Sequence, residues 1–111
     1  MSEYSSNLIR GNVYMLLLGL IEELPSAHGY QLIKEVEKRS RGFFHLKEGT
    51  IYPTLHRMES EGLLIGQWQA TSNGPKRRCY TITAKGSRVL SRQKVSWQNF
   101  TKAISLVFEV D

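Results

Sequence analysis

Residues 48–62 have the length and apolar pattern of a single helix, and this helix with the strand directly after it restricts the fold more than any other stretch. Ile51, Leu55 and Met58 recur at helical spacing, so we expect a buried stripe on a helix that begins near Glu48. Gly62 suits the left-handed residue that often ends a helix. A strand pattern begins immediately afterwards, so the helix must pack beside whatever sheet that strand joins.

Two short strands and a basic turn come next. Residues 64–69 and 78–83 are rich in strand-forming side chains, and Asn73-Gly74-Pro75 supplies the turn between them. The loop is longer than a two-residue hairpin turn, so we expect it to project as a wing. A helix fits the major groove of duplex DNA, and a basic hairpin tip can meet the flanking phosphates.

Two further helices are expected before this unit. Residues 8–24 carry apolar side chains at helical spacing, and Pro25 ends that helix. Residues 26–39 form a shorter helix, which His28 helps to start. Trp68, in the first strand of the hairpin, is expected to pack in the core beneath the wing.

The last segment, residues 84–110, is expected to be one long helix. Roughly 25 residues at about 1.5 Å each give a rod near 40 Å, which is longer than a head of this size can cover. A symmetric homodimer is the simplest partner for its apolar seam. The seam consists of Leu90, Gln93, Trp97, Phe100, Ile104 and Val107, and all of these except Gln93 form the expected dimer interface.

This order of elements predicts a mainly α fold with a small β-hairpin wing. It is the order of a winged helix-turn-helix that is followed by a long C-terminal dimerisation helix. We expect residues 1–83 to form the winged helix-turn-helix domain and residues 84–111 to form the dimerisation helix.

Composition agrees with a polyanionic partner and argues against several other classes. The chain has 15 Lys and Arg against 10 Asp and Glu, a net charge of +5. A single cysteine, Cys79, excludes an internal disulfide and fits a cytoplasmic protein; a redox role for it is a weak alternative. The longest apolar run is too short to span a membrane. No metal site, cofactor motif or catalytic constellation is visible, so we expect no enzyme.

The chain resembles the PadR-type transcriptional regulators, specifically the short kind with one C-terminal helix. The matching blocks run in order over nearly all of residues 8–90, which makes the signal specific. They are Leu-Ile-Arg-Gly at 8–11, His-Gly-Tyr at 28–30, Gly-Thr-Ile-Tyr-Pro-Thr-Leu-His-Arg-Met-Glu at 49–59, Glu-Gly-Leu-Leu at 61–64 and Arg-Arg-Cys-Tyr-Thr-Ile-Thr-Ala-Lys-Gly at 77–86.

Together, the helix, the wing and the resemblance predict the DNA-contacting residues. Thr50 and Thr54 are expected to meet base edges from the exposed face of the helix. Tyr30 and Tyr52 match family positions and could donate to phosphate, although a packing role is an equal alternative. The backbone contacts are expected from Lys47, Arg57, Lys76, Arg77 and Arg78. Lys47 stands where many relatives have a capping Ser, which leaves the cap of this helix in question.

The resemblance also implies a site for a small effector. Some short members hold flat aromatic compounds at a tryptophan between two subunits, and Trp97 lies at the matching place. The alternative is that Trp97 and Phe100 are ordinary dimer-core residues. The implied pore is lined by Trp97, Phe100, Gln93, Leu90, Tyr14, Met15 and Leu18.

The hypothesis from sequence is therefore a homodimeric repressor that binds a pseudo-palindromic operator and that a planar aromatic effector releases. Two alternatives stay open, namely a protein-interaction module and a ligand-binding protein, each using the same scaffold without specific DNA binding.

Overall fold

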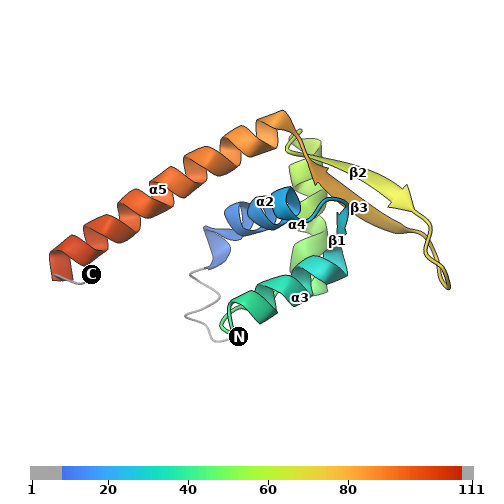
Figure 1. Cartoon of the computed structure of the whole chain (residues 1–111), viewed down its shortest axis with the longest axis horizontal. Coiled ribbons are helices and arrows are strands. Elements are labelled where there is room, and N and C mark those ends of the chain that lie inside the picture. The colour runs from blue at the N-terminus through green and yellow to red at the C-terminus, as the bar shows by residue number, and fades with distance from the viewer. Residues whose placement is uncertain (1–8, 109–111) are drawn as a thin grey trace.

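A computed structural model describes residues 9–108 of the chain (Figure 1). Three helices and a small sheet form a head, from which the last helix extends to one side. The longest dimension of the molecule is 53 Å, against 31 and 20 Å for the other two. The elements are α2 (Val13–Glu23), β1 (Ala27–His28), α3 (Gly29–Arg39), α4 (Glu48–Ser60), β2 (Leu64–Gln69), β3 (Arg77–Ile82) and α5 (Ala84–Phe108).

Helix α2 runs through the centre of the core. Leu17, Leu18 and Ile21 are all at most 1% exposed, because α3, α5 and β3 pack around this helix. The expectation of one unbroken helix over 8–24 is wrong in its first part. Ile9 and Arg10 are helical, a turn follows at 11–12, and α2 begins only at Val13. Leu8 lies outside the described residues.

The second helix starts later than expected because Ala27 and His28 form a strand. These two residues pair antiparallel with Tyr80 and Cys79, which makes a three-stranded sheet in the order β1-β3-β2. His28 caps α3 as expected, since its Nδ1 accepts a hydrogen bond from the Gln31 N–H at 3.3 Å.

Helix α4 begins at Glu48, as the sequence predicts, and Lys47 at its cap position makes no side-chain capping bond. Its C-terminus is closed by backbone alone. Gly62 has φ +78°, the Gly62 N–H donates to Glu59 O, and the Leu63 N–H donates to Met58 O. This pair of bonds is a Schellman motif, which explains why glycine is needed there.

Strands β2 and β3 form the expected hairpin, with Leu64 opposite Ile82 and Gln69 opposite Arg77. The two strands and the loop between them, residues 70–76, together form the wing. One expectation about side chains on the hairpin is wrong, and one alternative loses its basis. Trp68 is 64% exposed because β2 runs past the core, and Cys79 is buried at 4% because β3 is the central strand. A buried thiol has little access to an oxidant, which removes the basis for the redox alternative.

Helix α5 leaves the head after its first two turns. Gly86 packs directly on the backbone, since a Cβ there would lie 2.3 Å from Leu63 O. Leu90 is 2% exposed and belongs to the core of its own chain, although the sequence placed it in the dimer seam. Beyond Leu90, α5 carries no buried residue up to Phe108, and the expected end at Val110 lies outside the described residues. In the part of the chain that is described, no helix is long and apolar enough to cross a membrane.

Candidate nucleic-acid interface

The outward face of α4 is exposed along its whole length. Ile51, Leu55 and Met58 turn into the core, so the opposite side of the helix carries Gly49, Pro53, His56 and Ser60. Thr50 and Arg57 lie on one flank of this face and are also exposed. His56, at the middle of the outward face, was not among the residues selected from sequence. The period set by the three buried residues was the signal that could have found it.

Thr54 does not lie on this face, so its expected role in base contact is wrong. It is 3% exposed, because it stands three residues after Ile51 and four before Met58, on the buried stripe. Its hydroxyl donates to Thr50 O at 2.7 Å, which satisfies the polar group inside the protein.

Two tyrosines lie near the N-terminal ends of α3 and α4. The Tyr52 ring covers Gly29, where a Cβ would lie 2.4 Å from Cε1, yet Tyr52 remains 44% exposed. Tyr30 is 53% exposed, with the Lys34 ammonium 5.2 Å from its ring centroid. Both side chains therefore combine a packing contact with a surface that a ligand can reach.

The wing carries three consecutive cations, of which two are free and one is paired with a carboxylate. Lys76 and Arg77 are exposed, and neither side chain has a hydrogen bond or ion pair within residues 9–108. Arg78 is bound instead by the Glu59 carboxylate, with its Nε 3.4 Å from Oε1, and its guanidinium lies 5.4 Å from the Trp68 ring centroid. The hydrogen bond to Glu59 raises the pKa of Arg78. Arg78 therefore connects the base of the wing to α4 through Glu59. The sequence had suggested a free cation at this position.

On the other flank, Arg57 is held against α2. Its guanidinium carbon lies 6.0 Å from the Tyr14 ring centroid, and the Tyr14 hydroxyl donates to Glu61 Oε1 at 2.5 Å. Burial, followed by the Glu61 hydrogen bond, raises the pKa of Tyr14, so the phenol stays protonated and remains a donor at neutral pH.

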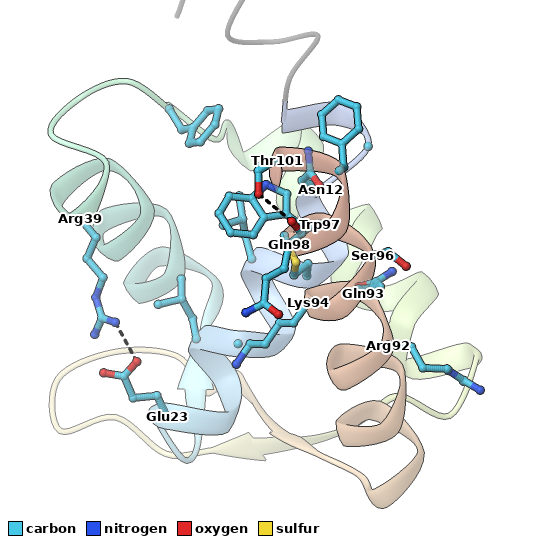
Figure 2. A pocket seen from close by; sticks show the side chains of 17 residues that line it. Asn12, Glu23, Arg39, Arg92, Gln93, Lys94, Ser96, Trp97, Gln98 and Thr101 are labelled. Atoms are coloured by element: carbon cyan, nitrogen blue, oxygen red, sulfur yellow. Dashed lines mark hydrogen bonds and ion pairs between the residues drawn. The ribbon is translucent and has the colours of Figure 1, made fainter. Parts of the chain in front are cut away.

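A groove of about 1200 Å³ lies between α2 and α5 (Figure 2). Four of the residues expected at the implied pore line this groove of the single chain, namely Trp97, Phe100, Gln93 and Met15. Leu18 and Leu90 do not line it, because both are buried in the head. Tyr14 does not line it either, since its hydroxyl reaches across to α4.

Some polar groups of the groove have a hydrogen-bond or ion-pair partner, and one does not. At one wall Arg39 of α3 binds Glu23 of α2 at 2.8 Å, as Figure 2 shows. Gln93 Oε1, in contrast, is buried and has no hydrogen-bond partner among the described residues. A buried acceptor without a donor is unfavourable, which makes Gln93 the weakest polar contact at the groove.

The rest of the α5 seam is open in the single chain. Trp97, Phe100, Ile104 and Val107 are each between 45% and 74% exposed. Apolar side chains that follow one another at heptad-like spacing are typical of a helix that packs on a partner. In the described residues, no group of three or more His, Cys, Asp or Glu side chains could hold a metal ion.

Comparison with known proteins agrees with this geometry. The structure resembles a PadR-like transcriptional regulator from Bacillus cereus, with 32% identity, a TM-score of 0.79, and coverage of 95% of this chain and 99% of that one. A PadR family regulator from Clostridium difficile R20291 is 34% identical, with a TM-score of 0.68 over 86% of this chain and 96% of that one.

Sequence relationships give the same assignment. The transcriptional regulator Rv3488 of Mycobacterium tuberculosis is 34% identical over 77 residues, which are 69% of this chain and 68% of that protein. The model of the transcriptional regulator PadR-like family matches residues 17–92, which hold α3, α4, the hairpin and the start of α5. The chain therefore belongs to the PadR-like family of transcriptional regulators.

Proposed function

We propose that this protein is a sequence-specific DNA-binding repressor that acts in the cytoplasm as a homodimer. The observation that carries the proposal is the exposed outward face of α4 beside a wing whose two cations, Lys76 and Arg77, have no internal partner among the described residues. A helix inserted in the major groove would bring Thr50 and His56 to base edges. Lys76 and Arg77 would then lie against the flanking phosphates.

Backbone contacts would also come from the start of α4 and the tyrosines beside it. Lys47 is exposed at the N-terminal end of the helix, where unpaired N–H groups favour an anion. Tyr30 and Tyr52 keep enough exposed surface to donate to phosphate. Arg57 completes the set on the α2 flank.

Dimerisation through α5 would place a second copy of α4 on the same side of the DNA. The seam of Trp97, Phe100, Ile104 and Val107 supplies the apolar surface for that contact. Two such helices would bind half-sites about 34–36 Å apart, or a multiple of this distance. Repression would then follow from exclusion of the polymerase.

A planar aromatic effector would bind in the α2–α5 groove and stack on Trp97. The groove also supports a second candidate function, a ligand-binding protein that does not bind DNA specifically, because the groove has room for a drug-sized molecule beside Trp97. Under both functions, a planar aromatic compound should quench the fluorescence of Trp97, and this quenching should be absent in Trp97→Ala. Only the repressor also releases DNA when the aromatic binds.

A mobility-shift assay tests the main proposal, with DNA from upstream of the protein's own gene and of neighbouring genes. Lys76→Ala/Arg77→Ala should lose most of the binding. Lys38→Ala/Arg88→Ala removes the same charge from exposed positions on α3 and α5 and should retain it. Failure of the wild type to shift any of these fragments at low salt would exclude DNA binding. Equal losses in the two double variants would show that net charge, rather than the wing, drives association.

A further inference from the structure

Tyr14 connects two parts of the molecule that are distant in sequence. It stands on α2, yet it touches the C-terminal end of α4 twice, through the Glu61 carboxylate at 2.5 Å and through the Arg57 guanidinium 6.0 Å from its ring. Arg57 Nη2 also lies 3.5 Å from Thr54 Oγ1. The guanidinium is therefore positioned between the side of its own helix and the ring of Tyr14.

This arrangement restricts a side chain that would otherwise be mobile. An exposed arginine samples many rotamers, and fixing one of them on binding DNA costs conformational entropy. A ring beneath the guanidinium favours one orientation before DNA arrives. The Glu61 bond in turn fixes the direction of the Tyr14 ring.

The same end of α4 is also tied to the start of α5. Lys85 Nζ donates to Glu61 O at 2.8 Å, and the Thr83 hydroxyl donates to Gly62 O at 2.6 Å. With Tyr14, these bonds hold the C-terminal end of α4 from both helices that form the groove. Met15, next to Tyr14, lines that groove.

We propose that Tyr14 is a positioning residue for DNA binding, which holds Arg57 in the orientation that meets the DNA and makes that orientation depend on α2. The proposal rests on the DNA-binding function proposed above.

A double-mutant cycle on DNA affinity tests this role, with an operator fragment that the wild type binds. Tyr14→Met removes the ring but keeps apolar bulk, and we expect it to weaken binding about two- to fivefold, the range that an exposed cation–π contact accounts for. In an Arg57→Ala background the same substitution should have no further effect. Tyr14→Phe keeps the ring but loses the Glu61 bond, so its affinity should lie between those of the wild type and Tyr14→Met.

A second measurement changes the other partner of the contact, Arg57 on α4. Arg57→Lys keeps the charge at an exposed position but loses the planar group, so it should weaken binding in the wild type and not in Tyr14→Met. The comparison of Arg57→Lys with the wild type does not depend on how well the Tyr14 variants fold, because it requires a loss of affinity from Arg57→Lys alone.

Several outcomes would overturn the inference. A purely structural role predicts an equal loss from Tyr14→Met in both backgrounds, together with a lower melting temperature. Unchanged affinity in Tyr14→Met or in Arg57→Lys, with normal wild-type binding, refutes the positioning role alone. If the wild type itself binds no DNA, the proposed function fails and the inference fails with it.

Discussion

The wing cations give the most quantitative prediction, because the salt dependence of DNA binding counts the phosphates that a protein neutralises. Lys76 and Arg77 are exposed and have no internal ion pair in the described chain, so their substitution should leave the fold intact. A dimer presents each of them twice. If all four cations contact phosphates, each contributes ~0.9 to the steepness of log K plotted against log salt. Lys76→Ala/Arg77→Ala should therefore make this slope shallower by about 3.6.

That change in slope has a measurable consequence. Between 50 and 200 mM salt, the affinity of the wild type should fall about 150-fold further than that of the double variant. The two proteins should therefore differ strongly at low salt and converge as salt rises. Fluorescence anisotropy of a labelled operator duplex at five or six salt concentrations gives both slopes.

Arg78→Ala is the matched comparison on the same strand. Arg78 is already neutralised by Glu59, so its loss should change the slope by less than either neighbour does. Parallel lines for the wild type and Lys76→Ala/Arg77→Ala would refute the wing as a phosphate contact. A slope change for Arg78→Ala as large as that of the double variant would refute the distinction between free and paired cations.

Three further predictions concern the seam, the core and a cap. Ile104→Glu places a charge on the exposed α5 seam and should give monomers in sedimentation velocity with an unchanged circular dichroism spectrum, whereas a persistent dimer would exclude this seam as the interface. Leu90→Ala removes a side chain that is 2% exposed and should lower the free energy of unfolding by about 2–5 kcal/mol, measured by urea denaturation; a loss under about 1 kcal/mol would contradict its place in the core. Burial, and then Arg77, lowers the pKa of His28, so the unfolded chain binds its proton more readily and stability should fall as pH drops below about 6.5. His28→Asn keeps a capping side chain and should flatten that fall, and an identical pH profile in the variant would remove His28 as its source.

Strong periodicity and turn chemistry made much of the fold predictable. The start of α4 at Glu48, the strand over 64–69 and the long loop after it all follow from residues whose local preference agrees with their tertiary position. Gly62 was a further reliable signal, because a left-handed residue at that point suits glycine far better than other residues. Ala27 and His28 were missed as a strand, since two residues are too few to show an alternating pattern.

The wrong predictions have a common physical cause. The polarity and spacing of side chains do not show which part of the protein a helix or strand face packs against. Thr54 carries a hydroxyl and was placed outside, but Thr50 O satisfies that hydroxyl within the core. Leu90 shares the period of the seam, yet it packs against α2 in its own chain. Trp68 is large and aromatic, but it lies on a strand that extends past the core and carries a guanidinium on its ring.

Pairing between charges was equally invisible in the sequence. Three consecutive cations, Lys76, Arg77 and Arg78, look alike along the chain, and only the fold brings Glu59 to the last of them. The contact of Tyr14 with Arg57 joins residues 43 positions apart and has no local signature. The internal partners of charged side chains therefore require the tertiary structure.

Selection of binding sites from a random duplex pool shows whether two copies of α4 bind DNA together. The protein is incubated with the pool at moderate salt, and bound duplexes are amplified and sequenced over several rounds. We predict enrichment of an inverted repeat whose half-site centres lie about one helical turn, or a multiple of it, apart. Enrichment of no sequence, or of a single unrepeated site, would show that two copies of α4 do not bind DNA as a pair.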